Sequence, residues 1–315
     1  MDFERIAALE YVDLYVAPGF ADVKVRPGYH SPREEVPADL SSEIEDLRKA
    51  LLERLSEVGS PEFSFRMGGK LHRVTAMTTA EDALTFVLRR ASDGVRSLAS
   101  LNVPKHVRAA AVDRGLRGLV LVVGAQASGK TSTLMAMFCE RMRALGGVGV
   151  AIEDPIETDG LAGLHGEGRI HHYSASRHQG GYAEQIIKSL RHGADAILMG
   201  EIREPAAAQI VLREAANGST IFSTAHAASI PEALARLCDF FPNTADGRAM
   251  LAHSLRFMIH QDLESSAKGS LLRCTTLSLQ GADAKRIQQK IIDGRFSHIE
   301  EEIADQRKKA LMQPA

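Results

Sequence analysis

One short glycine-bearing segment holds the residues best suited to chemistry. It reads Gly124-Ala125-Gln126-Ala127-Ser128-Gly129-Lys130-Thr131, the pattern GxxxxGK[ST]. In such a loop, glycines let successive backbone N–H groups face a phosphate, and the dipole of a following helix adds to the attraction. Lys130 would supply a mobile cation to the β- and γ-phosphates, and the Thr131 hydroxyl would coordinate Mg²⁺. We therefore expect these residues and the adjoining Ser132 to bind a nucleoside triphosphate.

Two apolar segments end in the carboxylates that a phosphate loop needs to hold Mg²⁺ and orient a water. Residues 196–199 precede Gly200 and Glu201, and residues 148–152 precede Glu153, Asp154 and Glu157. Because Pro155 prevents a strand from running on, we expect these acids at the carboxyl edge of a sheet, where ligands bind. A solvated acidic loop and an acid at a helix start are the alternatives.

A third apolar segment, residues 220–225, ends at His226. A histidine at this edge would sense the γ-phosphate or contact a neighbouring subunit. An ordinary polar loop residue is the alternative.

Strands and helices are expected to alternate along the part of the chain that positions these residues. Buried strands are expected at residues 118–123, 148–152, 196–199 and 220–223. Helices are expected at 130–144, 182–191 and 205–216. This alternation indicates a parallel sheet in an α/β fold. Beyond residue 231 helices dominate, at 231–238, 244–259, 285–292 and from 299 onward.

The first hundred or so residues read as a separate small α+β domain. Strands are expected at 11–16, 21–25, 63–67, 71–77 and 84–88, and the last three are antiparallel. A helix over 41–58 has Ser41 or Ser42 as its cap. Residues 91–103 fit a linker. We thus expect domains at 1–100 and 101–315, the second with a helical part from about residue 240.

The amino-acid composition argues against several classes of protein. The 315 residues include 38 basic and 40 acidic ones, so the formal charge of -2 argues against a general polyanion binder. The 3 cysteines form no CxxC pair, which disfavours structural zinc and a disulfide framework. No signal-peptide pattern opens the chain, and no apolar run approaches the ~20 residues of a membrane span. We expect a soluble protein of a reducing compartment.

Four motifs taken together resemble the secretion ATPase superfamily, which drives type II secretion, type IV pili and type IV secretion. Residues 124–131 resemble its phosphate loop, 151–157 its Asp box, 190–204 its Walker B strand and 216–229 its His box. The PilT-type pilus retraction ATPases are the most similar branch. The resemblance implies a RecA-like P-loop core preceded by a small PAS-like α+β domain and followed by a helical C-terminal extension.

The resemblance also implies roles for single residues. Glu157 matches the glutamate that activates water, Glu201 the Walker B acid that acts on Mg²⁺ through water, and His226 the second His-box histidine. Arg73 and Arg89 match arginines that reach a nucleotide at a ring interface, although exposed strand charges are the alternative reading. Arg191 and Arg203 match supporting cations.

Three features depart from the family pattern. Ser219 stands where the first His-box histidine is expected, and Ala127 replaces the second glycine of the loop. Residues 287–295 match the isoleucine–glycine–basic segment of retraction ATPases, but Lys290 occupies an apolar position. The chain also lacks the paired CxxC sites of many assembly ATPases, which favours the retraction or type IV secretion branches.

The expected function is therefore that of an ATP-hydrolysing, Mg²⁺-dependent homo-hexameric motor. It would be cytoplasmic and held at the inner membrane by a platform protein of a pilus or secretion machine, without inserting itself. Pilus assembly and type IV secretion or conjugation are alternatives within this class. A nucleotide-gated adaptor with little turnover is another. A nucleic-acid translocase is disfavoured because aromatic residues make up only 5% of the chain and no basic stripe accompanies them.

Overall fold

The computed structural model describes residues 2–26, 31–176, 180–266 and 269–312. These divide into two compact units. The N-terminal unit comprises Met1–Gly94, Glu153–Gly160 and Tyr173–Gly181. The larger unit comprises Val95–Ile152, Leu161–His172 and Tyr182–Ala315. Within the described residues, no helix combines the length and apolar character that crossing a membrane requires.

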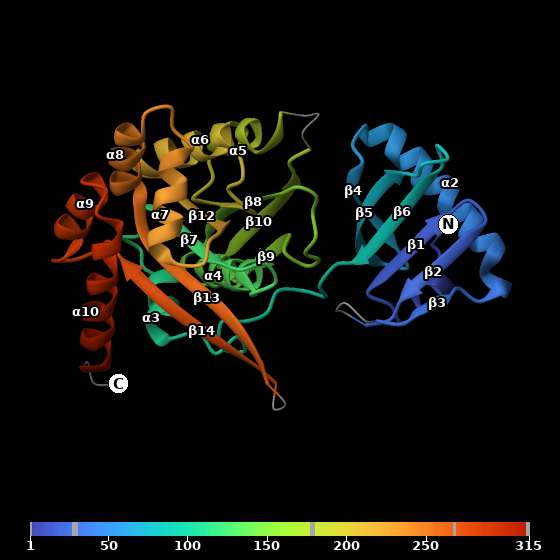
Figure 1. The fold of residues 1–315 in the computed structure, drawn as a ribbon, viewed down its shortest axis with the longest axis horizontal. Coiled ribbons are helices and arrows are strands. Elements are labelled where there is room, and N and C mark those ends of the chain that lie inside the picture. The colour runs from blue at the N-terminus through green and yellow to red at the C-terminus, as the bar shows by residue number, and fades with distance from the viewer. Residues whose placement is uncertain (1, 27–30, 177–179, 267–268, 313–315) are drawn as a thin grey trace. The chain divides into compact units, whose positions relative to one another are not determined.

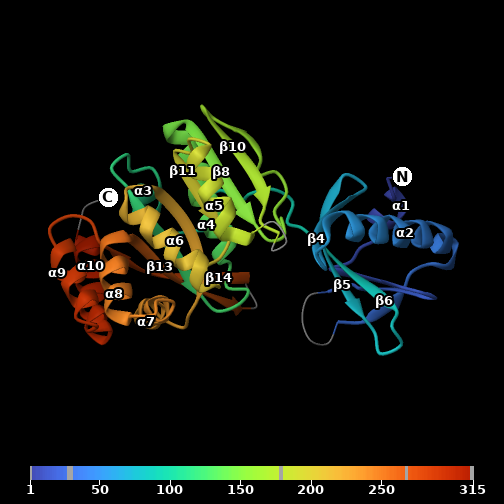
Figure 2. The ribbon, with the colours of Figure 1, turned by 90° about the horizontal axis from the view of Figure 1, so that it is seen from above.

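The N-terminal unit is built on a six-stranded sheet of order β3-β2-β1-β6-β5-β4. Its strands are β1 Asp13–Ala17, β2 Phe20–Lys24, β3 Arg33–Glu35, β4 Glu62–Met67, β5 Lys70–Thr78 and β6 Leu84–Arg90. Helix α2, Ser41–Val58, contacts β1 and β4 and lies across one face of the sheet (Figure 2). The short helix α1, Glu4–Ala7, completes the apolar core.

Most sequence expectations for this unit are confirmed. The 41–58 helix has the predicted bounds, and β4, β5 and β6 form the predicted antiparallel set. The expected serine cap of α2 is wrong, because Leu40 is the N-cap residue. The Ser41 hydroxyl instead donates to the carbonyl of Ala38, in the 3-10 turn Ala38–Leu40 that leads into the helix.

The larger unit contains an eight-stranded sheet of order β14-β13-β7-β12-β11-β8-β10-β9 (Figure 1). Its strands are β7 Gly118–Gly124, β8 Gly147–Glu153, β9 Gly163–His165, β10 Gly168–Ser174, β11 Ala196–Met199, β12 Thr220–His226, β13 Leu255–Ser266 and β14 Gly269–Ser278. The central strands β13, β7, β12, β11 and β8 run parallel. This is the parallel sheet that the alternation of strands and helices predicts.

Helices cover both faces of the central strands. Helix α4, Lys130–Leu145, packs over Val120, Val122 and Phe222 in one apolar cluster. The neighbouring Leu119 and Leu121 point to the opposite face, since side chains alternate along a strand. Helix α6, Pro205–Ala216, contacts β7 and β12. The remaining helices are α3 Lys105–Ala111, α5 Gly181–Arg191, α7 Ile230–Asp239, α8 Thr244–Ser254, α9 Ala284–Ile292 and α10 Ile299–Met312.

The main correction concerns the segment beyond α8. The expected helix over 244–259 ends at Ser254, and residues 255–266 form β13, which pairs with β7 on one side and β14 on the other. Residues Leu255 to Ile259 are mostly apolar, a pattern that suits a buried helix and a buried strand equally. Hydrogen bonding to β7 makes this segment a strand. The C-terminal part therefore contains a long hairpin as well as helices (Figure 1).

Candidate functional site

The carboxyl ends of three parallel strands bring the main candidate residues of the larger unit together. Strand β7 leads into the phosphate loop at Gly124, β12 ends at His226, and β11 is followed by Gly200 and Glu201. His226 pairs in register with Gly124. Because parallel strands share one carboxyl edge, segments 124–132, 200–203 and 226 meet there, as the sequence predicts.

The phosphate loop turns sharply between β7 and α4. Gly129 precedes α4 with a φ of 83°, and Ala127 has a φ of 60°. Both values lie in the left-handed region, which costs an alanine roughly 1 kcal/mol relative to glycine. The loop therefore keeps its curl despite the alanine, as the motif requires. The Ser128 hydroxyl is buried and has no hydrogen-bond partner among the described residues.

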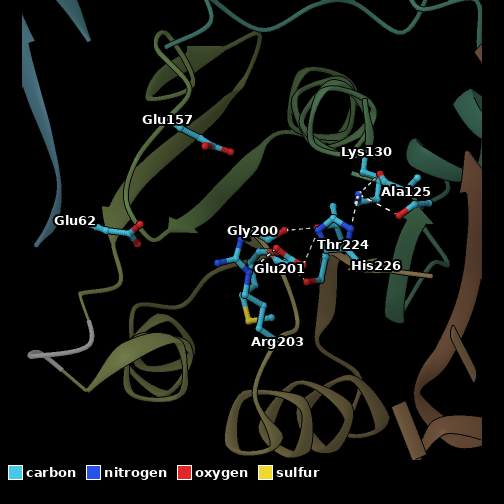
Figure 3. A network of polar contacts seen from close by, with 12 residues as sticks. Glu62, Ala125, Lys130, Glu157, Gly200, Glu201, Arg203, Thr224 and His226 are labelled. Atoms are coloured by element: carbon cyan, nitrogen blue, oxygen red, sulfur yellow. Dashed lines mark hydrogen bonds and ion pairs between the residues drawn. The ribbon is translucent and has the colours of Figure 1, made fainter. Parts of the chain in front are cut away.

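Lys130 begins α4 and turns its amino group back over the loop. Nζ donates to the carbonyl oxygens of Gly124 at 3.2 Å and Ala125 at 2.7 Å. It also lies 3.3 Å from Nδ1 of His226 (Figure 3). Burial lowers the pKa of Lys130 from its ordinary value, and the negative charge of Glu201 partly opposes this shift. An anion at the loop would favour the charged form further.

His226 links the lysine to the acid of the neighbouring strand. An ammonium group only donates, so Nδ1 of His226 accepts from Lys130 and the ring proton sits on Nε2. Nε2 lies 3.1 Å from Oε1 of Glu201, and Oε2 of that carboxylate accepts from Nε of Arg203 at 2.6 Å. A continuous line of contacts thus joins Lys130, His226, Glu201 and Arg203 (Figure 3).

Hydroxyl groups of β12 hold the end of β11 in place. The Ser223 hydroxyl donates to the carbonyl of Met199 at 2.9 Å, and the Thr224 hydroxyl donates to that of Gly200 at 2.7 Å. Both bonds are buried or partly buried, where a lost partner costs about 1–3 kcal/mol. They fix the backbone that carries Glu201. Sequence reasoning missed both groups, although hydroxyl residues inside an apolar strand were a visible signal.

Beside this line of contacts lies a cavity of about 360 Å³. Its lining includes Gln126, Glu201, Arg203, His226 and Arg236. Nη1 of Arg236 donates to the carbonyl of His226 at 2.5 Å. These polar groups suit an anion and its counter-ion, and they make up about half of the lining, the rest of which is apolar.

The remaining candidates of the larger unit are more dispersed. Thr131 is half-buried and Ser132 exposed in the first turn of α4. Arg191 ends α5 and is exposed. Ser219 precedes β12, at the opposite end of that strand from His226, and its carbonyl accepts from the Gly118 N–H at 3.1 Å.

Glu157 belongs to the N-terminal unit, and so do the two candidate arginines. Nη1 of Arg73 lies 3.4 Å from Oε2 of Glu157, and its Nη2 lies 3.2 Å from Oε1 of Glu62. The Asp154–Pro155 peptide in the acidic segment is cis. The Ser64 hydroxyl donates to the Ile156 carbonyl at 2.8 Å, which ties this segment to β4.

Arg89 makes a different pair. Its Nε and Nη2 donate to the two carboxylate oxygens of Asp13 at 2.7 and 3.0 Å. Hydrogen bonding to Asp13 raises the pKa of Arg89 above its ordinary value, so the guanidinium stays charged. The Asp13 side chain is only 2% exposed. Asp13 and Glu62 were missed in the sequence, because partners on paired strands have no local spacing signal.

Comparison with known proteins places the chain in a family. Residues 65–314 match the family model described as type II/IV secretion system protein. A twitching motility protein of Neisseria gonorrhoeae is 30% identical over 75% of this chain and 62% of its own length. The type IV pilus retraction ATPase PilT of Pseudomonas aeruginosa is 35% identical over 47% of this chain and 42% of its own length. The chain thus spans less than two thirds of either relative.

Solved structures support the fold. A pilus retraction motor PilT with bound ADP superimposes with a TM-score of 0.76 at 22% identity, covering 94% of this chain and 86% of that one. The ATPase DotB of Legionella pneumophila gives the same TM-score and coverage at 19% identity. The expected resemblance to secretion ATPases, with PilT-type proteins among the similar ones, is confirmed. The chain belongs to the type II/IV secretion system protein family.

Proposed function

We propose that this protein is an ATP-hydrolysing motor of a type IV pilus or secretion machine, most similar in action to the retraction type. The observation that carries the proposal is the line of contacts from Lys130 through His226 to Glu201, at the carboxyl edge of the sheet. This line connects Lys130 of the phosphate loop, through His226 on β12, to Glu201 just after β11. A protein that only bound the nucleotide would need Glu201 less, because this acid is proposed to act on Mg²⁺ during hydrolysis.

The donor groups fit a nucleotide and Mg²⁺. The backbone N–H groups of the 124–129 turn, the buried Lys130 ammonium and the unpartnered Ser128 hydroxyl suit a triphosphate. The Thr131 hydroxyl and the Glu201 carboxylate are oxygen donors, which Mg²⁺ prefers, and Glu201 would act through water. Mg²⁺ commonly takes few protein ligands beside phosphate oxygens, so two suffice. When bound, the metal neutralises charge on the phosphates.

Glu157, Arg73 and Arg89 complete the proposal. Glu157 orients or deprotonates the attacking water, and the arginines supply permanent charge to the phosphoryl group during transfer. Arg73 already contacts Glu157, which supports their acting as a pair. For Arg73 to serve a nucleotide it would exchange one of its two carboxylate partners for phosphate.

The proposal extends to assembly. We propose domains at 1–100 and 101–315, working as a homo-hexamer that docks on an inner-membrane platform protein. Arginines of the first domain would reach a nucleotide at a ring interface, so that hydrolysis requires movement between domains. Support comes from the family match and from the retraction motor among the similar structures.

Steady-state phosphate release tests the motor reading. Glu157→Gln is expected to lower the rate at least ~10²-fold, the scale of a positioned acid or base. Glu62→Gln is the matched control, because Glu62 contacts the same arginine and has no assigned role in water activation. Its rate is expected to stay within about threefold of the wild type.

Two results would contradict the proposal. Equal slow release by the native chain and by Glu157→Gln would favour the nucleotide-gated adaptor. A strong rise in the native rate on adding single-stranded or duplex nucleic acid would favour the translocase.

A further inference from the structure

The phosphate loop rests on a residue that no sequence motif marks. Gln261 lies in β13, which pairs with β7, the strand that leads into the loop. Its side chain is buried, with 1% of the residue exposed. A buried amide costs free energy unless it is hydrogen-bonded, so the buried side chain of Gln261 calls for a partner.

That partner is the loop backbone. Nε2 of Gln261 lies 2.6 Å from the Ser128 carbonyl oxygen. A carbonyl oxygen only accepts, so the amide N–H of Gln261 is the donor. Oε1 of the same side chain has no hydrogen-bond partner among the described residues. Among the described residues, the side chain of Gln261 thus makes its one hydrogen bond to the phosphate loop.

Two loop glycines give Gln261 this access. A Cβ added at Gly124 would lie 2.2 Å from the Gln261 carbonyl oxygen, and one added at Gly129 would lie 2.9 Å from Nε2. Real Cβ atoms almost never come this close to other atoms. Gly124 is therefore required by the approach of the β13 backbone as well as by the turn, whereas a Cβ at Gly129 would displace the end of the Gln261 side chain.

The hydrogen bond has a directional consequence. In a trans peptide the C=O and the N–H point in opposite directions within one plane. Gln261 holds the Ser128 carbonyl on the β13 side, so the N–H of Gly129 in the same peptide is directed to the other side. That N–H belongs to the residue just before Lys130, where backbone donors of a phosphate loop face their ligand.

We propose that Gln261 is a positioning residue of the nucleotide site, which sets the orientation of the Ser128–Gly129 peptide without touching the nucleotide. The inference rests on the nucleotide binding put forward in the proposed function. It adds that β13, outside the four family motifs, contributes a side chain to phosphate recognition.

The first test is Gln261→Met, which keeps the side-chain length and removes the donor. In the full-length chain, the Kd for a fluorescent ADP analogue is expected to rise about five- to tenfold, the effect of one lost hydrogen bond. The KM for ATP should rise similarly while kcat stays within about twofold. Gln306→Met is the matched control, since Nε2 of Gln306 donates to the Ser278 carbonyl at 2.8 Å. Its Kd should match that of the wild type.

The second test uses Gln261→Glu and a pH series. Only a protonated carboxyl group can donate to the Ser128 carbonyl, so nucleotide affinity relative to the wild type should improve as pH falls. At low pH, where the new side chain is neutral, affinity should exceed that of Gln261→Met, which a residue that merely fills space would not produce. It also provides a readout if the methionine variant folds poorly.

The outcomes separate the two proposals. Lys130→Ala in the same assay reports whether the loop binds nucleotide at all. If the wild type binds, Lys130→Ala does not, and both Gln261 variants bind like the wild type at every pH, the role of Gln261 is refuted and the proposed function stands. A wild-type chain that binds no nucleotide refutes both.

Discussion

Lys130 in the larger unit and the two candidate arginines in the N-terminal unit have different kinds of partner. In the larger unit, Lys130 contacts two backbone carbonyls and a histidine, all of them neutral acceptors. In the N-terminal unit, Arg73 and Arg89 are held by carboxylates. The lysine ammonium therefore has no carboxylate directly against it among these contacts, and the charge of Glu201 acts on it across His226. The arginine charges are already neutralised nearby, so those residues would have to exchange partners to serve a phosphate.

The two arginines also differ from each other. The Arg73 side chain is 31% exposed and its partners Glu157 and Glu62 are 44% and 41% exposed. Arg89 instead covers Asp13, whose side chain is buried. An exposed pair contributes little to stability, because water and salt screen it. A buried carboxylate that loses its ion-pair partner is costly. Arg73 is therefore the more easily released of the two, whereas Arg89 also stabilises the fold through its pair with Asp13.

Substitution of the arginines makes this difference measurable. Arg73→Gln is expected to lower phosphate release by about 10²-fold while the free energy of unfolding changes by less than about 1 kcal/mol. Arg89→Gln is expected to lower that free energy by about 1–3 kcal/mol, because it leaves Asp13 buried without its guanidinium. Rate measurements and denaturant unfolding of both variants provide the check. Equal stability of the two variants would remove the distinction between them.

Local sequence could predict the phosphate loop and not these ion pairs. The loop is contiguous, and its curl follows from glycine positions between an apolar strand and a helix. Asp13 and Arg89 are far apart in the chain and meet only because β1 and β6 pair in register. The same holds for Gln261, whose partner Ser128 becomes a neighbour through the pairing of β13 with β7.

Strand β13 shows most clearly which elements local sequence cannot predict. Its apolar stretch follows the helix α8 without a glycine or proline to mark the change. Helix and strand both bury such a stretch, so periodicity does not separate them. By contrast α2 has polar and apolar residues at helical spacing and a glycine at its end, and its bounds were predicted correctly. The sequence therefore predicts the bounds of an element best where a residue such as glycine or proline marks its end.

The N-terminal unit should also have its own acid sensitivity. His72 is fully buried, with Nε2 2.9 Å from the Tyr11 hydroxyl and Nδ1 3.1 Å from the Lys70 carbonyl oxygen. Burial, helped by the nearby charges of Arg90 and Lys70, lowers the pKa of His72 to about 4. The unfolded chain takes up a proton near its ordinary value of 6.5, which the folded chain resists.

Stability should therefore fall as pH falls from about 6.5 to about 4. Between about pH 7.5 and about pH 5, this single histidine would lower the free energy of unfolding by about 2 kcal/mol. His72→Gln should flatten that part of the pH dependence, even if it lowers stability overall. Denaturant unfolding at several pH values measures the slope. His298→Gln, on an exposed turn, is the control, and a slope that His72→Gln leaves unchanged would contradict the assignment.

The smallest effect is expected in a cluster of charged residues on α9 and α10, outside the four family motifs. Nζ of Lys290 in α9 lies 2.7 Å from Oε1 of Glu302 in α10, and Arg286 donates to both oxygens of that carboxylate at 2.9 and 2.6 Å. The lysine at this apolar position of the family pattern is therefore paired rather than misplaced. Hydrogen bonds from Arg286 and Lys290 lower the pKa of Glu302, which keeps it ionised.

Lys290→Ile restores the residue type that the retraction segment leads us to expect. Glu302 keeps Arg286, so the unfolding midpoint should fall by only about 2 °C, and phosphate release should not change. The loss should shrink at high salt, because an ion pair is screened and apolar packing is not. Thermal unfolding at low and high salt distinguishes the two. A rise in the midpoint at low salt would mean that apolar packing beside Ile287 and Ile291 outweighs the pair, and that Lys290 is kept for a reason other than stability.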